Sequence, residues 1–139
     1  QGPTRPLRIL LAEDSRDNVM LIQAYLRDSP HQLEVVGDGD AAVARFKAGD
    51  IDLVLMDIRM PGKDGYTATW EIREWERAQG RTPVPILALT AHALKEDEQR
   101  SREAGCDSHL TKPLRKTVLL EILEHYHVGG VAGATPGKE

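Results

Sequence analysis

The stretch Ile51–Gly65, IDLVLMDIRMPGKDG, determines how the rest of the chain is interpreted. Its apolar run Leu53–Met56 is typical of a short strand buried on both faces, and a carboxylate, Asp57, follows it directly. The turn signal Met60-Pro61-Gly62 comes next, because proline disfavours helical backbone in the residue before it and glycine permits positive φ. A helix is predicted to begin near Asp64, a residue type that caps helix N-termini. Open α/β sheets place their chemistry at the C-terminal ends of strands, so Asp57 is the first candidate functional residue.

Length and composition indicate one compact domain that is not expected to bind nucleic acid or membrane surfaces directly. The chain has 139 residues, 40% of them hydrophobic, and a net charge of -4 from 18 basic and 22 acidic residues. No block of basic residues stands out, so direct contact with nucleic acid or membrane is not expected. The single cysteine, Cys106, excludes an internal disulfide and a cysteine-built zinc site, and we interpret it as structural. No signal peptide is recognisable, and no apolar run approaches the roughly 20 residues of a membrane helix.

Around the central stretch, the chain repeats a strand followed by a helix, five times in all. The first predicted helix is capped within Ser15–Asp17 and ended by Ser29-Pro30. The helix predicted over Lys95–Ala104 has few apolar positions, so we expect it to be largely exposed. The predicted strands are Arg8–Ala12, Gln32–Val36, Leu53–Met56, Ile86–Leu89 and Ser108–Leu110, and the later helices are Asp40–Ala48, Gly65–Ala78, Lys95–Ala104 and Leu114–Tyr126.

Alternating strands and helices imply a parallel sheet with helices on both faces. With right-handed crossovers, the predicted fold is α/β, a flavodoxin-like doubly wound sheet of five parallel strands in the order 2-1-3-4-5 with five helices. In that order polar groups from four strand ends meet at one edge of the sheet, at the topological switch point. Any one of these polar groups could be an ordinary solvated loop residue, but that interpretation accounts poorly for the whole set. The converging residues are Glu13, Asp14, Asp57, Thr90 and Lys112.

Those side chains are the parts of a phosphoryl-transfer site. Crowded carboxylates repel one another unless a cation is present, and carboxylate and carbonyl oxygens suit a hard cation. We expect Mg²⁺, which takes few protein ligands and leaves a position for a phosphoryl oxygen. A lysine that neutralises charge and a threonine that donates a hydrogen bond complete the requirements for an aspartyl phosphate.

The segments ILLAED, LMDIRMPGKDGY, PILALTAHAL and HLTKP carry a family resemblance. Over Leu7–Tyr126 the sequence resembles response-regulator receiver domains of two-component signalling, and it is most similar to the receivers of hybrid histidine kinases. The resemblance implies a phosphorylation-dependent signalling switch rather than an enzyme with turnover. It also implies that Asp57 is the phosphoryl acceptor. In the family, the peptide bond that corresponds to the one before Pro113 is commonly cis.

The same resemblance assigns the metal ligands and the residues of the switch. It implies that Asp14 and Asp57 bind Mg²⁺ directly, that Glu13 acts through water, and that the backbone carbonyl of Arg59 completes the protein ligands. Thr90 is similar to the switch hydroxyl of the family, and Lys112 to its phosphoryl-binding lysine. The second switch position, usually aromatic, is His109 here, whose imidazole is smaller than a tyrosine ring and titrates near neutral pH; we expect a weak, pH-sensitive switch there. The residues assigned by the resemblance are Glu13, Asp14, Asp57, Arg59, Thr90, His109 and Lys112.

The resemblance also implies the partner and the limits of the domain. A histidine kinase or a histidine phosphotransfer domain is expected to donate the phosphoryl group and to dock against the first helix, where Leu21 or Tyr25 contributes apolar contact. We predict a linker or expression remnant at residues 1–6, the receiver domain at 7–127 and a flexible tail at 128–139. The expected location is the cytoplasm, as a free domain or as the cytoplasmic part of a membrane-bound sensor kinase.

Two other functions are compatible with parts of the sequence. A phosphohydrolase of the haloacid-dehalogenase type also forms an aspartyl phosphate with Mg²⁺, but its second aspartate, two residues after the nucleophile, is replaced here by Arg59. The run Gly37-x-Gly39-x-x-Ala42 matches a dinucleotide-binding fingerprint. That alternative gives no role to the acidic pair or to Lys112, and glycines that shape a tight turn explain the run better.

Overall fold

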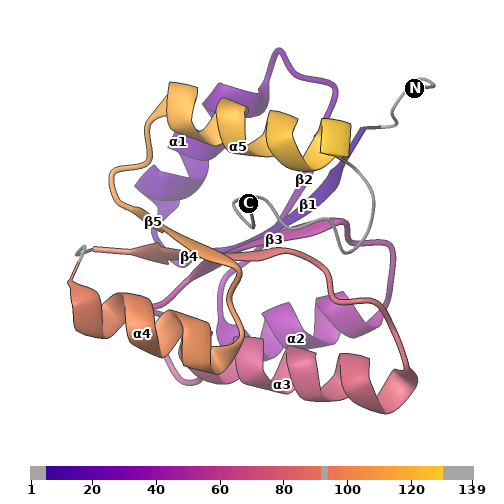
Figure 1. Cartoon of the computed structure of the whole chain (residues 1–139). Helices are drawn as coiled ribbons and strands as arrows, with labels where there is room; N and C mark the ends of the chain where they lie inside the picture. Colours follow the sequence, from indigo (N-terminus) through magenta and orange to yellow (C-terminus); the bar gives the residue numbers. More distant parts are fainter. Residues whose placement is uncertain (1–5, 92–93, 130–139) are drawn as a thin grey trace.

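The computed structural model describes residues 6–91 and 94–129, and it has the predicted architecture. Five parallel strands form one sheet in the order β2-β1-β3-β4-β5. Helices α1 and α5 cover one face of the sheet, and α2, α3 and α4 cover the other (Figure 1). The elements are β1 (Arg8–Ala12), α1 (Arg16–Leu26), β2 (Gln32–Val36), α2 (Gly39–Lys47), β3 (Leu53–Asp57), α3 (Gly65–Gln79), β4 (Ile86–Thr90), α4 (Lys95–Ala104), β5 (Ser108–Thr111) and α5 (Lys116–Gly129).

Alternating side chains of the sheet build two apolar cores. Val54 and Met56 point toward α2 and α3, and Leu53 and Leu55 point toward α1 and α5. All five residues of β3 are buried, and so are all five of β4. The prediction of a central strand buried on both faces is therefore confirmed, and this rigid strand carries Asp57.

The helix ends follow the predicted capping chemistry. Ser15, Asp38 and Asp64 are the N-caps of α1, α2 and α3, and each side chain accepts a hydrogen bond from a backbone N–H in the first turn. Gly80 and Gly105 end α3 and α4 in the left-handed conformation, with φ of 66° and 112°. Because Asp38 is the cap, α2 begins at Gly39, one residue earlier than predicted.

Helix α5 shows the largest difference from the predicted bounds. Helix α5 was expected over Leu114–Tyr126, but it begins at Lys116 and continues to Gly129. The Lys112-Pro113 peptide bond is cis. Neither glycine nor proline occurs between Lys116 and Gly129, so nothing ends the helix earlier. Residues 1–5 of the predicted linker and 130–139 of the predicted tail lie outside the described ranges.

Helix α4 is the least buried helix of the second face, as predicted from its polar sequence. Ser101 is its one buried residue, and Leu94 caps it without a side-chain hydrogen bond. Near its N-terminus, the hydroxyl of Tyr66 in α3 donates to the carbonyl of Asp97 over 3.5 Å, and further along the guanidinium of Arg100 lies over the Tyr66 ring, 4.5 Å from its centroid. Polar rather than apolar contacts therefore hold this end of α4.

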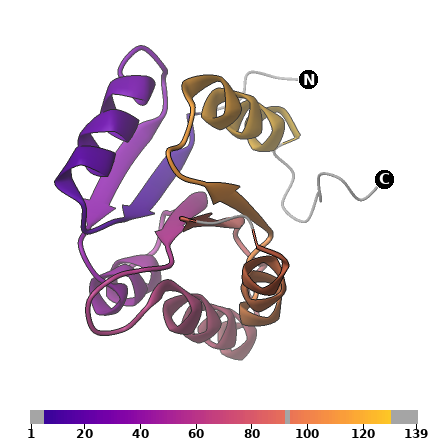
Figure 2. The ribbon, with the colours of Figure 1, turned by 90° about the vertical axis from the view of Figure 1, so that its left-hand side faces the viewer.

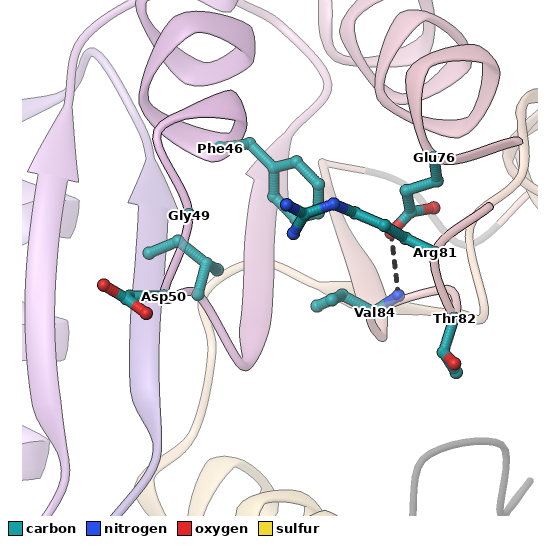
Figure 3. Close-up of a pocket in the computed structure, with 8 residues that line it drawn as sticks. Phe46, Gly49, Asp50, Glu76, Arg81, Thr82 and Val84 are labelled. Atoms are coloured by element: carbon teal, nitrogen blue, oxygen red, sulfur yellow. Dashed lines mark hydrogen bonds between the residues drawn. The ribbon is translucent and has the colours of Figure 1, made fainter. Parts of the chain in front are cut away.

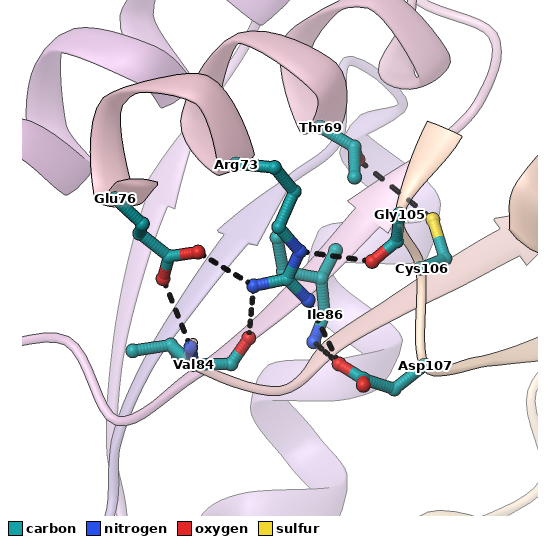
Figure 4. A network of polar contacts seen from close by, with 8 residues as sticks. All are labelled: Thr69, Arg73, Glu76, Val84, Ile86, Gly105, Cys106 and Asp107. Carbon is teal, nitrogen blue, oxygen red and sulfur yellow. Dashed lines mark hydrogen bonds and ion pairs between the residues drawn. The ribbon is translucent and has the colours of Figure 1, made fainter. Parts of the chain in front are cut away.

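The C-terminal end of α4 is fixed by a buried arginine of α3 that the sequence did not reveal (Figure 4). Arg73 donates to the carbonyl oxygens of Gly105 and Val84, each over 2.9 Å. Its remaining donors reach the carboxylates of Glu76, at 2.8 Å, and Asp107, at 2.9 Å. One guanidinium thus joins α3 to the end of α4 and to the residues that precede β4 and β5.

Candidate active site and metal centre

The predicted site residues meet at the edge of the sheet where the strands end. Figure 2 views the molecule from this side. The neighbouring strands β1, β3, β4 and β5 each bring a polar residue to this edge. The residues are Glu13 and Asp14 directly after β1, Asp57 at the end of β3, Thr90 at the end of β4, and Lys112 directly after β5.

Three carboxylates form a cluster with the donor set of a divalent cation site. One oxygen each from Glu13, Asp14 and Asp57 lie within 4.8 Å of one another. Glu13 and Asp57 are 2% and 1% exposed, whereas Asp14 faces solvent. Burial and the neighbouring Asp57 raise the pKa of Glu13. Buried acids this close together are costly without a cation, and carboxylate oxygens are the ligands that Mg²⁺ accepts.

Lys112 supplies the positive charge of the site. Its Nζ lies 2.9 Å from Oδ1 of Asp57 and 3.3 Å from Oε1 of Glu13. Burial lowers the pKa of an ammonium group, but the hydrogen bond and charge of Asp57, with those of Glu13, outweigh burial and raise the pKa of Lys112. The ammonium is therefore charged at neutral pH.

The two oxygens of Asp57 have different surroundings. Oδ1 faces Lys112 and accepts a hydrogen bond from the backbone N–H of Arg59 over 3.3 Å. Oδ2 is buried and has no hydrogen-bond partner among the described residues. A buried carboxylate oxygen without a partner is expensive, which makes Oδ2 the position where a metal ion or a phosphoryl group fits.

The switch candidates Thr90 and His109 lie on the same face of the sheet. Thr90 is opposite Thr111 in the β4–β5 register, and His109 precedes Thr111 by two residues. The imidazole Nε2 of His109 lies 3.6 Å from a carboxylate oxygen of Glu98 in α4. In this structure His109 is thus directed to α4, and its role as the switch residue stays a prediction.

The loop between β3 and α3, residues 58–64, runs past the site and packs tightly at its end. The N–H of Gly65 donates to the carbonyl of Ile58 over 3.0 Å. A Cβ on Gly65 would lie 2.4 Å from the carbonyl oxygen of Asp57, far inside contact distance. Glycine is therefore required at this position, and the loop closes directly against the backbone of Asp57.

A cavity of about 240 Å³ lies at the opposite edge of the sheet and contains none of the predicted site residues (Figure 3). Two of its polar side chains, Glu76 and Arg81, are engaged in the fold. Glu76 accepts a hydrogen bond from the N–H of Val84 over 2.9 Å. The guanidinium of Arg81 lies over the ring of Trp75, 4.9 Å from its centroid. The Trp75 ring in turn meets Phe46 edge to face.

The fold and the site together define a class of protein: a doubly wound α/β domain with an acidic cluster and a lysine at its C-terminal edge. Comparison with known proteins gives the family. The chain belongs to the response regulator receiver domain family, whose model matches residues 9–124. It is a receiver domain of two-component signalling, and the resemblance inferred from the sequence is confirmed.

The relatives include receivers within sensor kinases. The sensor histidine kinase GacS of Pseudomonas protegens is 38% identical over 120 residues, which make up 86% of this chain and 13% of the kinase. The receiver domain of sensor histidine kinase PA1611 of Pseudomonas aeruginosa, solved with a magnesium ion in its active site cleft, is 39% identical with a TM-score of 0.78, over 88% of this chain and 98% of that one. This chain thus spans a small part of the length of the kinases it matches.

A further match comes from a complex. A chain of the co-crystal structure of the Saccharomyces cerevisiae phosphotransfer protein Ypd1 with the receiver domain of Ssk1 is 26% identical, with a TM-score of 0.87, over 93% of this chain and 94% of that one. Within the described residues, no helix of this chain is both long and apolar enough to cross a membrane.

Proposed function

We propose that Asp57 accepts a phosphoryl group from a phosphohistidine in a Mg²⁺-dependent reaction, and that the resulting acyl phosphate is a signalling state. The observation that carries this assignment is the asymmetry of the Asp57 carboxylate: Lys112 and a backbone N–H hold Oδ1, and Oδ2 is buried without a hydrogen-bond partner in residues 6–91 and 94–129. A carboxylate oxygen attacks phosphorus, the bond between phosphorus and the imidazole nitrogen breaks, and the electron pair returns to the histidine of the donor.

The other residues bind and orient the reacting groups. Asp14, Asp57 and the backbone carbonyl of Arg59 hold Mg²⁺ in this proposal, with Glu13 acting through water. When bound, the cation offsets charge on the phosphoryl oxygens. Lys112 neutralises a further oxygen from its position 2.9 Å from Asp57, and the Thr90 hydroxyl donates to another once the phosphoryl group is attached.

We further propose that the acyl phosphate persists, so that the domain stores a signal instead of turning over substrate. In phosphohydrolases that use an aspartyl phosphate, a second acid protonates the leaving group. Arg59 occupies that position here, and a guanidinium side chain does not serve as a general acid. Steady multiple-turnover hydrolysis of a generic aryl phosphate would contradict this part of the proposal.

The proposed donor is a histidine kinase or a histidine phosphotransfer domain that docks beside the site against α1. The complex that contains Ypd1 and a receiver supports this choice. Met20 of α1 is 57% exposed and offers apolar contact that was not singled out from the sequence. Leu21 is partly exposed, whereas the hydroxyl of Tyr25 donates to the carbonyl of Leu114 over 2.9 Å, so Tyr25 serves the fold.

Incubation with acetyl phosphate and Mg²⁺, followed by intact mass measurement, tests the acceptor. The wild-type protein is expected to gain one phosphoryl group, and chelation of the metal is expected to abolish the gain. Asp57→Asn retains the fold and loses the acceptor oxygen. A phosphoryl adduct of equal yield on Asp57→Asn would show that the acceptor is another residue.

A further inference from the structure

We infer that Lys63 is a positioning residue that holds the β3–α3 loop in place, and thereby sets the affinity of the site for Mg²⁺ and its rate of phosphorylation. The inference rests on the proposed function, because it takes the Arg59 carbonyl of this loop as a metal ligand. Lys63 itself is not expected to touch the metal or the phosphoryl group.

One ammonium group joins the loop to two helices. Nζ of Lys63 lies 2.9 Å from Oδ1 of Asp40, in the first turn of α2, and 2.6 Å from Oε1 of Glu71, in α3. These two hydrogen bonds raise the pKa of Lys63, so the group stays charged at neutral pH. One side chain thus connects the loop to α2, although α2 lies far from the loop in sequence.

The backbone of the loop contacts the same helix directly. A Cβ on Gly39, the first residue of α2, would lie 2.4 Å from the carbonyl oxygen of Lys63. This close approach explains the second glycine of the run that resembled a dinucleotide fingerprint: it makes room for the loop, not for a pyrophosphate. Gly65, which follows the loop, lies equally close to the carbonyl of Asp57, which precedes the loop. The loop is therefore held on both sides.

The position of the loop matters because Arg59 contributes two backbone groups to the site. Its N–H donates to Oδ1 of Asp57, and its carbonyl is the proposed metal ligand. Ion pairs near the surface contribute little to global stability. Loss of the Lys63 contacts should consequently loosen the loop and the metal geometry while leaving the free energy of unfolding nearly unchanged.

The test is Lys63→Met, which keeps the length of the side chain and removes its charge. Isothermal titration with Mg²⁺ should give a dissociation constant raised about three- to tenfold, below the roughly 10- to 100-fold typical when direct partners of metal ligands are lost. In the metal-free protein, amides of residues 58–64 should exchange faster than in wild type. The rate of phosphorylation by acetyl phosphate should fall at limiting Mg²⁺ and recover at saturating Mg²⁺.

Graded and control variants separate this role from a general effect of charge. Glu71→Gln removes one partner and should give an intermediate affinity, whereas Lys63→Arg should restore most of the wild-type value. Lys47→Met removes an exposed lysine of α2 and should match wild type in both measurements.

The outcomes distinguish the two proposals. If wild type binds Mg²⁺ and is phosphorylated, but Lys63→Met has the same affinity and the same loop exchange, Lys63 is an ordinary surface residue and the inference is overturned. If wild type neither binds Mg²⁺ nor gains a phosphoryl group, the proposed function fails and the inference fails with it.

Discussion

The surroundings of the Asp57 carboxylate are those expected of the proposed phosphoryl acceptor. Oδ1 is engaged by Lys112 and by the N–H of Arg59, and these contacts fix the orientation of the group. Oδ2 is buried at the end of a fully buried strand and has no hydrogen-bond partner in the part of the chain that the structure describes. Preorganisation of this kind costs stability in the free protein and lowers the cost of reaching the reactive geometry.

Gly65 and Gly37 provide a matched test of how closely the β3–α3 loop packs on Asp57. Gly65→Ala places a methyl group 2.4 Å from the Asp57 carbonyl and should destabilise the protein by about 1–3 kcal/mol, because the backbone has to move. Gly37→Ala meets nothing within 4 Å and should be neutral or stabilising by up to about 1 kcal/mol. Urea unfolding monitored by circular dichroism measures both. Equal stabilities for the two variants would contradict the close approach at Gly65.

At the level of elements, Arg73 connects more of the fold than any sequence pattern suggested. The side chain reaches Glu76 within α3, but its other partners, Val84, Gly105 and Asp107, lie 11 to 34 residues further along the chain. Because Gly105 has no side chain, it leaves room for the aliphatic part of the Arg73 side chain. Because this contact fixes the C-terminal end of α4, any displacement of α4 on phosphorylation is expected to be larger at its N-terminal end.

Arg73→Met should therefore cost about 3 kcal/mol, because it leaves the buried carboxylate of Glu76 without its cation. Arg77→Met is the control: Arg77 forms an exposed pair with Glu74 on the same helix, and its loss should cost less than about 1 kcal/mol. Chemical denaturation gives both values. A cost for Arg73→Met no greater than that for Arg77→Met would mean that the network adds nothing to stability.

The order of the elements could be predicted because each depends on local chemistry. Apolar runs placed the strands, and Ser15, Asp64 and Gly80 placed helix ends, since caps act within a single turn. The Arg73 network and the contact between Lys63 and Asp40 could not be predicted. Both join residues far apart in sequence, and charged residues on a predicted helix or loop are by default assigned to solvent.

For the whole molecule, the strand order was the step that assembled the site from the sequence. Once the sheet was assigned the order 2-1-3-4-5, Glu13, Asp57 and Lys112 had to meet at one edge, and the structure brings them within hydrogen-bond or ion-pair distance. Side-chain directions were beyond such reasoning. The contact of His109 with Glu98, for example, depends on how α4 packs against β5.

Global stability should depend on Mg²⁺, since the cation relieves repulsion among the clustered carboxylates. At a Mg²⁺ concentration 100-fold above its dissociation constant, the folded state should gain about 2.7 kcal/mol, seen as a higher midpoint of thermal unfolding. Asp14→Asn should lose most of this gain, whereas Asp28→Asn, an exposed acid remote from the cluster, should retain it. An equal gain in both variants would place the bound cation elsewhere.

The arrangement around Trp75 determines what the intrinsic fluorescence of this protein can report. The chain has two tryptophans, both in α3. Trp75 lies between Phe46 and Arg81 beside the cavity at the edge opposite Asp57, and Trp70 is 53% exposed. Unfolding should change the emission of Trp75, but Trp75 lies at the edge opposite the proposed acceptor, so its emission is not expected to follow phosphorylation. A kinetic assay of phosphorylation by emission therefore needs a new reporter beside the acceptor, for which Ile58→Trp is the natural choice.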